Sequence, residues 1–360
     1  MKNLKYTVGG LLIIILGMGM AYAGDGQIDI AVLPYTISKP GSYIVTRDLT
    51  LTTLDTSGIT ITTGSVTLDL NGHALRGPGK TAGVGGCGII LSGPMSDLII
   101  RNGIVCEWRA DGVNVANADN SQVENICSHS NGLSGIEAGY GSKVTGNTCL
   151  SNGNNGIWSG VSNIIGNTCR LNGNTGIAVS AASTIINNTC TYNGGFGIAG
   201  GYGSTITNNT CQGNTYEGII SSSSTIIGNT VRNGGSTGIY SDSNSLIREN
   251  ICEGNHSSGI RVGSSCRVVE NVCAGNGPAT YDGAGIEAIN SRNSIEHNLV
   301  NNNDRGIDCN PATGNYIASN RASGNTTDYD IVAGNVWGAI VNMTGGGLIA
   351  TTDPYANFQF

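Results

Sequence analysis

The stretch that decides the fold runs from Asn147 to Asn187 and reads NTCLSNGNNGIWSGVSNIIG followed by NTCRLNGNTGIAVSAASTIIN. Each copy begins with N-T-C, passes through N-G to G-I, and ends shortly after an isoleucine that lies three residues before the next marker asparagine. The marker recurs at steps of 20, 21, 21, 20, 21 and 21 residues, at Asn147, Asn167, Asn188, Asn209, Asn229, Asn250 and Asn271. The G-I pair keeps the same step from Gly135 to Ile260. Two markers that stay in phase over so many copies indicate a solenoid.

The period is too short, and the repeat too rich in Gly, Asn, Ser and Thr, for a pair of helices in each copy. Each copy instead contains two or three pieces of three to five residues with β-branched centres, separated by turn formers. When such pieces stack, each strand pairs in parallel with its copy about 4.8 Å away. The sequence therefore predicts an all-β fold, a parallel β-helix.

The repeated residues have structural interpretations. The isoleucine of G-I and the Ile or Val three residues before the marker asparagine are expected to form two inward stacks. The marker asparagines are expected to form an amide ladder that satisfies buried polar groups. Gly and Asn of N-G are expected to supply the positive φ angles of a corner.

Four segments follow from these patterns. Residues 1–23 read as a secretory signal, with Lys2 and Lys5, an apolar core and Ala21-Tyr22-Ala23 as a cleavage site, which predicts a secreted, periplasmic or cell-surface protein. Residues 24–65 are expected to be an N-terminal cap, residues 66–325 the helix, and residues 326–360 a C-terminal cap. No Pro-rich or charged linker interrupts the repeat, so one domain is expected.

Composition limits the partners. The net charge is −7, and loss of Lys2 and Lys5 with the signal would make it −9. An acidic chain of this kind is a poor candidate for binding nucleic acid or an anionic membrane. The apolar core of the signal is short for a bilayer, so no membrane span is expected after cleavage.

The run VTLDLNGHALRG from Val66 to Gly77, with the N-x-C and G-I repeats, resembles bacterial exported right-handed parallel β-helix repeat proteins of the pectate lyase-like superfamily. The closing segment from Asn320 to Phe360 resembles the ends of uncharacterised members of that group. The resemblance implies a right-handed, single-stranded β-helix, for which we expect about eleven coils and a length of roughly 55 Å. Relatives include pectate and alginate lyases, polygalacturonases and epimerases, but none of their catalytic motifs is found in this sequence, so no catalytic residue is carried over.

Eleven cysteines are present, and seven occupy the N-x-C position: Cys127, Cys149, Cys169, Cys190, Cys211, Cys252 and Cys273. Val231 and Val300 fill the same slot, which favours a column of small buried groups. Parallel stacking keeps the Cβ atoms too far apart for disulfides, so mostly free thiols are expected.

The residue after the G-I isoleucine is expected to point outward, which predicts one column on the outer face of a sheet. From the N-terminal end the column reads Asn114, Glu137, Trp158, Ala178, Ala199, Ile220, Tyr240, Arg261, Glu287 and Asp308. Arg261, Glu287 and Asp308 are the candidate catalytic residues, with the two carboxylates expected about 5 Å apart. Such a pair can hold Ca²⁺ or act on a glycoside, whereas the alternative interpretation is an exposed charge ladder.

Tyr240, Trp158 and Glu137 are the candidate substrate-binding residues. Trp108, Arg109 and Asp111 are expected near Glu137 and Trp158, where an aromatic ring can stack on a sugar. No two of the four histidines have metal-ligand spacing, so no cofactor is required, and Ca²⁺ at Glu287 and Asp308 is the metal to consider.

Two functions remain open. One is a non-catalytic secreted or envelope protein that binds polysaccharide or a cell-surface glycan, or acts as a scaffold. The other is a polysaccharide lyase or glycoside hydrolase that acts on an acidic polysaccharide. The missing motifs and the low content of charged residues favour the first.

Overall fold

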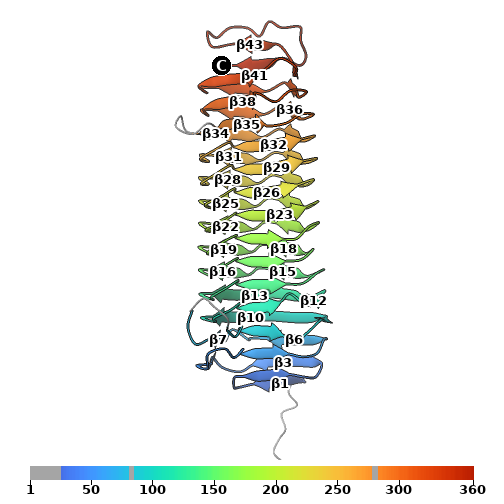
Figure 1. Cartoon of the computed structure of the whole chain (residues 1–360), viewed down its shortest axis with the longest axis vertical. Helices are drawn as coiled ribbons and strands as arrows, with labels where there is room; N and C mark the ends of the chain where they lie inside the picture. Colours follow the sequence, from blue (N-terminus) through green and yellow to red (C-terminus); the bar gives the residue numbers. More distant parts are fainter. Residues whose placement is uncertain (1–25, 81–84, 278–282) are drawn as a thin grey trace, which may run out of the picture.

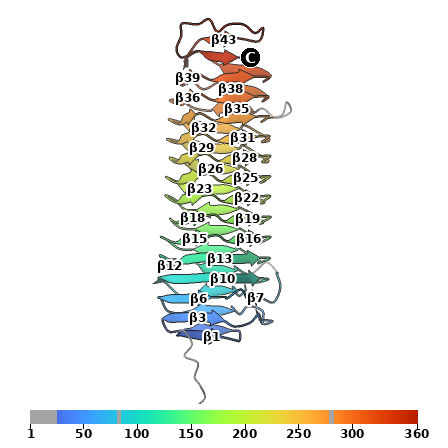
Figure 2. The same cartoon turned by 180° about the vertical axis from the view of Figure 1, so that it is seen from behind.

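The computed structural model describes residues 26–80, 85–277 and 283–360, and this part of the chain is all β, without a helix. Figures 1 and 2 show one elongated column, with the N-terminal strands at one end and the C-terminal strands at the other. The expected signal at residues 1–23 lies outside the described residues, as do residues 278–282 of the insertion between Gly275 and Gly283.

Each regular turn contributes three short strands. In the turn that contains Trp158 they are β15 (Lys143–Thr145), β16 (Thr148–Leu150) and β17 (Ile157–Ser159). Each strand pairs in parallel with its equivalent one turn on, as Cys149 with Cys169. The first two strands of a turn belong to a 28-stranded sheet and the third to a 14-stranded sheet. The fold is therefore a parallel β-helix, as predicted.

The 14-stranded sheet carries the candidate site. Its strands are β2 (Tyr35–Ile37), β5 (Ile59–Ile61), β8 (Ile89–Leu91), β11 (Val113–Val115), β14 (Ile136–Ala138), β17, β20 (Ile177–Val179), β23 (Ile198–Tyr202), β26 (Ile219–Ser222), β29 (Ile239–Ser243), β32 (Ile260–Ser264), β35 (Ala284–Ala288), β38 (Arg305–Cys309) and β41 (Thr327–Ile331).

The number of turns is about 15, so the expected eleven coils are too few. The expected count left out residues 24–65, which lack the marker pair. In the structure, β1 (Gln27–Ile30), β3 (Gly41–Val45) and β6 (Val66–Asp69) already stack in one parallel register. At the other end β41 continues the stack above β38. With about 4.8 Å for each turn, the column is about 70 Å long rather than 55 Å.

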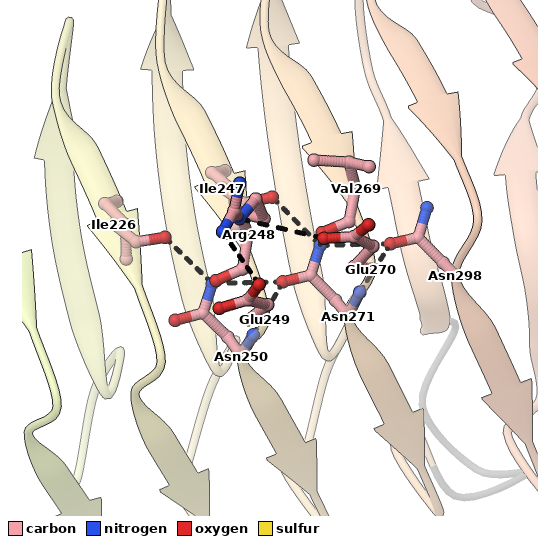
Figure 3. Close-up of polar contacts among 9 residues, drawn as sticks. All are labelled: Ile226, Ile247, Arg248, Glu249, Asn250, Val269, Glu270, Asn271 and Asn298. Atoms are coloured by element: carbon pink, nitrogen blue, oxygen red, sulfur yellow. Dashed lines mark hydrogen bonds and ion pairs between the residues drawn. The ribbon is translucent and has the colours of Figure 1, made fainter.

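The predicted asparagine ladder is present at the corner between the first and second strands. Asn250 Nδ2 donates to Asn271 Oδ1 at 3.0 Å, and Asn271 Nδ2 donates in turn to Asn298 Oδ1 at 3.0 Å (Figure 3). Each Oδ1 also accepts from the backbone N–H of the asparagine one turn before it. Arg248 lies on the solvent side of this corner, with Nη2 2.8 Å from Glu249 Oε1. The ladder satisfies polar groups that are wholly buried, as the repeat predicts.

Two further polar ladders complete the corners of the turn. At the second corner Asn152 Nδ2 donates to Asn172 Oδ1 at 3.0 Å, and the same contact recurs in neighbouring turns. At the third corner Ser183 N donates to Ser204 Oγ at 3.1 Å, and asparagine replaces serine from Asn293 onward. Three corners with three ladders hold the short strands in one register.

The left-handed backbone lies elsewhere than the sequence predicts. In the regular turns positive φ falls on the residue before the ladder asparagine, as in Ser151 and Gly166, and not on N-G glycines such as Gly153 and Gly173. Gly153 and Gly173 are required for another reason: a Cβ there would lie 2.0 Å and 2.2 Å from the carbonyl oxygen of the preceding turn. At these two glycines the expectation for N-G was wrong, because close stacking rather than φ demands glycine, whereas Asn71-Gly72 and Gly277 do have positive φ.

The core is a set of aligned stacks. The isoleucines of G-I and those three residues before the marker are buried, as predicted. All eleven cysteines are free, and Cys149, Cys169, Cys190 and Cys211 stack directly on one another. Burial, and then the neighbouring thiols of Cys149 and Cys190, raise the pKa of Cys169, which favours its protonated thiol form.

Cys127 is not part of this column, although it has the N-x-C spacing. Ser128 pairs with Cys149, and Ile126 takes the asparagine position, because its N–H donates to Asn147 Oδ1 at 2.9 Å. The phase of the repeat shifts by one residue here, so the spacing alone was misleading.

At the second corner, glycine replaces the ladder asparagine in one turn, so a side-chain amide is missing there. Gly234 N donates to Asn255 Oδ1 at 3.0 Å, and Gly235 N donates to Asn214 O, so Gly234 stacks on Asn214.

We expect Gly234→Asn to raise the free energy of unfolding by about 1 kcal/mol, because the oxygen of the new side-chain amide would accept from the Asn214 N–H. Gly234 does not have a positive φ, and the added Cβ needs a shift of only a few tenths of an ångström from Asn255 Oδ1. Urea unfolding of Gly234→Asn and Gly234→Ala provides the measurement. Equal stability of the two variants would contradict the ladder argument, since alanine adds the Cβ without the amide.

Candidate functional site

The predicted outward column exists in the predicted order. Register pairs join every neighbouring member, from Asn114 with Glu137 to Glu287 with Asp308. Asp330 continues it by pairing with Asp308. We call these residues the outer column. Residues spread over more than two hundred positions of sequence therefore lie in one line on the 14-stranded sheet.

A second line of side chains, which sequence reasoning missed, runs beside the outer column. Each member lies three residues before an outer-column residue, and backbone hydrogen bonds hold its turns in order, as from Gly176 N to Phe196 O. We call it the flanking column, and its members are Asp111, Ser134, Asn155, Thr175, Phe196, Glu217, Thr237, Ser258, Ala284, Arg305 and Thr327. The constant offset of three residues was readable in the sequence. Only the contacts described below give that offset a chemical meaning.

At the C-terminal end, Arg261 and Glu287 meet as predicted. Arg261 Nε lies 3.5 Å from Glu287 Oε1, and the two side chains are 41% and 20% exposed. Ser258 Oγ, from the flanking column, donates to Glu287 Oε2 at 2.6 Å. Both oxygens of this carboxylate therefore have partners within the protein.

Asp308 has partners of its own. Arg305 Nη1 lies 2.7 Å from Asp308 Oδ2, and Asn310 N donates to Asp308 Oδ1 at 2.9 Å. The same guanidinium reaches Asp330, with Nε 3.5 Å from Oδ2. Burial raises the pKa of Asp308 although Arg305 opposes this shift. Each of the two expected catalytic carboxylates thus has its own arginine and its own second donor, a hydroxyl for Glu287 and a backbone N–H for Asp308. This arrangement favours a charge ladder over a pair of carboxylates that act together on a glycoside.

A second carboxylate pair lies at the N-terminal end of the two columns. Asn114 Nδ2 donates both to Asp111 Oδ2 at 2.8 Å and to Glu137 Oε2 at 3.2 Å. Ser134 also serves both: its N–H donates to Asp111 Oδ1 at 2.8 Å and its Oγ to Glu137 Oε1 at 3.0 Å. Within the described residues, no arginine or lysine forms an ion pair with either carboxylate.

Both carboxyl groups of this pair hold their protons more tightly than usual. Burial raises the pKa of Asp111. Burial and then the Asp111 charge raise the pKa of Glu137. Unlike Asp308, which Arg305 faces, neither carboxyl group forms an ion pair with an arginine or lysine of the described residues that would offset the cost of its charge.

Of the neighbours expected beside this pair, Trp158 lies there, whereas Trp108 and Arg109 have partners elsewhere. Trp158 follows Glu137 in the outer column and is half-buried, so part of its ring faces solvent. Trp108 is wholly buried, and its Nε1 donates to Leu75 O at 3.1 Å, so it cannot stack on a sugar. That expectation was wrong because the irregular turn before Asp111 folds this ring into the core. Arg109 pairs instead with Asp55, at 2.9 Å.

Between the two carboxylate groups the outer column is almost free of charge. Trp158 and Tyr240 stand four turns apart, with Ala178, Ala199 and Ile220 between them. At the far end, Tyr240, Arg261 and Glu217 help line a surface depression of about 270 Å³. The result is a strip about 19 Å long with an aromatic residue at each end and small or aliphatic side chains between.

Comparison with known proteins agrees with this geometry at the level of the fold. A family described as the right handed beta helix region matches residues 181–322. The chain folds as a right-handed parallel β-helix. No curated protein sequence matches it.

Three solved structures illustrate the likeness of this β-helix to known folds. The A-module of mannuronan C-5 epimerase AlgE4 from Azotobacter vinelandii aligns with 15% identity and a TM-score of 0.52, over 86% of this chain and 88% of that one. The A-module of AlgE6 from the same organism aligns with 13% identity and a TM-score of 0.48, over 93% of this chain and 90% of that one. Tailspike protein 3 of bacteriophage CBA120 aligns with 12% identity and a TM-score of 0.47, over 91% of this chain and 59% of that one. Identities this low show a shared fold alone.

Two further properties bear on partners. The described residues contain no group of three or more His, Cys, Asp or Glu side chains placed to hold a metal ion. Calcium at Glu287 and Asp308 thus stays a prediction. No apolar helix of membrane-spanning length occurs in the part of the chain that the structure describes.

The raised pKa of Glu137 gives a pH-dependent stability with a definite sign. The ordinary pKa of a glutamate is 4.5, and the folded β-helix keeps this proton to higher pH than the unfolded chain does. Between the two pKa values the folded state binds more protons, so its stability falls as the pH rises. Glu137→Gln removes this loss. We expect the melting temperature of the variant, relative to the wild type, to increase from pH 4 towards pH 7, as measured by circular dichroism. A constant difference across that range would contradict the assignment.

Proposed function

We propose that this β-helix binds a polysaccharide without cleaving it, and that the glycan lies along the helix axis on the outer face of the 14-stranded sheet. The observation that carries the proposal is the strip from Trp158 to Tyr240. Aromatic rings supply large apolar faces for sugar rings, and small side chains between them leave room for a chain to lie flat. A strip of four turns is long enough for several sugar units in a row.

The charged ends of the two columns support binding rather than catalysis. Glu287 and Asp308 are each occupied by an arginine and a second donor, so neither offers a free base. In this proposal Arg261 and Glu287, which are 41% and 20% exposed, border the glycan surface and hydrogen-bond sugar hydroxyls, whereas Asp308 is buried and helps to hold this end of the surface in place. The signal expected at residues 1–23 would export the chain and bring this face into contact with extracellular or envelope glycan.

The experiment is a binding and turnover screen of the purified chain against pectate, alginate and neutral glycans, with and without Ca²⁺. Calorimetry reports binding, and new reducing ends or the ultraviolet absorbance of unsaturated products report cleavage. We expect binding without product. Product that is lost in Arg261→Ala and Glu287→Gln would instead establish the lyase or hydrolase function with the candidate catalytic residues.

A second candidate function, hydrolysis of the bound glycan, is favoured by one observation. Asp111 and Glu137 form an unneutralised carboxyl pair beside Trp158, and both have a raised pKa. A protonated carboxyl group is what a glycosidase uses to protonate its leaving group. In the same screen, reducing ends that disappear in Glu137→Gln but persist in Glu287→Gln would assign hydrolysis to this end of the columns.

A further inference from the structure

Aromatic residues recur along the proposed glycan surface at every second turn. Trp158 and Tyr240 belong to the outer column, four turns apart. Phe196 belongs to the flanking column and lies in the turn midway between them, that of Ala199. Tyr216, from the next turn and outside the two columns, lies 5.6 Å from Phe196 between ring centroids. The aromatic positions are therefore evenly spaced.

The turns between them carry smaller side chains in both columns. The first intervening turn has Ala178 and Thr175, and the second has Ile220 and Glu217. Ser236 Oγ donates to Glu217 Oε1 at 3.0 Å, which holds this carboxylate beside the depression at Tyr240. Within the two columns, turns with an aromatic residue thus alternate with turns without one.

The alternation has a definite length. Two turns of the stack rise about 9.6 Å, and the three aromatic positions span about 19 Å. An extended β-1,4-linked chain of gluco-configured sugars turns by about half a revolution at each linkage, so the same apolar ring face returns at every second sugar. The length of that disaccharide is close to two turns of this stack. A chain of five sugars reaches all three aromatic positions with its first, third and fifth rings.

We propose that this surface, which rests on the glycan-binding function proposed above, is matched to an uncharged polysaccharide with equatorial β-1,4 linkages. In the turns from Trp158 to Tyr240 the only charged residue of the two columns is Glu217, and the whole chain carries a net charge of −7. A polyuronate lying on this strip would meet a carboxylate and no cation until Arg261. Chains with β-1,3 or α-1,4 linkages coil, so they do not return the same face at this interval.

The test uses the full-length chain and soluble oligosaccharides of two to six sugars, measured by isothermal titration calorimetry. The probes are β-1,4-linked glucose and N-acetylglucosamine oligomers, compared with β-1,3-linked glucose, α-1,4-linked glucose and mannuronate oligomers. For the β-1,4-linked neutral series we expect affinity to rise about fivefold or more from two sugars to three and again from four to five. The step from five sugars to six should add little.

Phe196→Ala isolates the middle position. We expect it to weaken pentasaccharide binding about fivefold or more and to leave disaccharide binding unchanged, because a disaccharide contacts one aromatic position. Tyr192→Ala is the matched control: this ring is 48% exposed but lies at a corner of the 28-stranded sheet, so pentasaccharide affinity should not change. Melting temperatures of both variants check the fold.

The outcomes separate the two proposals. Equal affinity for length-matched β-1,3- or α-1,4-linked oligomers, a smooth increase with length, or a preference for mannuronate oligomers overturns the linkage and charge assignment while the glycan-binding function stands. If no oligosaccharide binds, both proposals fail.

Discussion

Asn209→Ala is expected to lower the free energy of unfolding by about 3–5 kcal/mol, the largest effect of any single substitution considered. The Asn209 side chain is buried, with Oδ1 accepting from Asn188 N at 2.8 Å and from Asn188 Nδ2 at 3.0 Å. Its Nδ2 donates to Ile185 O at 2.9 Å and to Asn229 Oδ1 at 3.0 Å. Alanine leaves several of these buried groups without a partner, and each costs about 1–3 kcal/mol.

The control for this substitution is Asn174→Ala. Asn174 is exposed, and its side-chain amide donates to Asn154 Oδ1 at 3.2 Å. We expect a change of about 0.5 kcal/mol or less. Urea unfolding measures both variants, and hydrogen exchange at the Asn188 amide reports the local effect, since a solenoid opens near its weakest interface. Equal destabilisation by the two variants would show that the buried ladder contributes no more than a surface amide.

Trp158→Ala is expected to weaken glycan binding about 30-fold, which corresponds to about 2 kcal/mol. Trp158 is the largest side chain on the strip, and it lies at the end of the strip next to the Asp111 and Glu137 pair. Its neighbours in the outer column are Glu137 on one side and Ala178 on the other, so no other ring can replace it. Calorimetry with the tightest-binding glycan of the screen measures the loss.

Two variants make the result on Trp158 specific. Trp158→Phe keeps an aromatic face and should retain most of the affinity. Trp337→Ala removes a tryptophan that is 41% exposed in β42 (Val336–Trp337), near the C-terminal end and away from the strip, so binding should not change. An equal loss in Trp158→Ala and Trp337→Ala would place the glycan elsewhere, and unchanged binding in Trp158→Ala would remove the strip from the proposal.

The candidate site was predicted in part. The outer column appeared in the correct order because parallel stacking places equivalent residues of successive repeats on top of one another. The partners of its charged members were not predicted, because Ser258 and Arg305 reach Glu287 and Asp308 from the flanking column, which the sequence reasoning did not consider. The Asp111 and Glu137 pair was expected only as residues near each other, without the shared donors that define it.

The repeat pattern alone was enough to predict that this chain is a β-helix, which residues face inward, and which residues share a column. The physical reason is that each ladder contact joins like to like, so the alignment of the repeats is also the register of the strands. The path of the chain where the repeat loses its phase could be seen only in the folded molecule. Trp108 turned into the core, Ile126 took an asparagine position, and the turns before Val66 joined the stack, since the path of an irregular turn depends on packing against neighbours that no periodicity specifies.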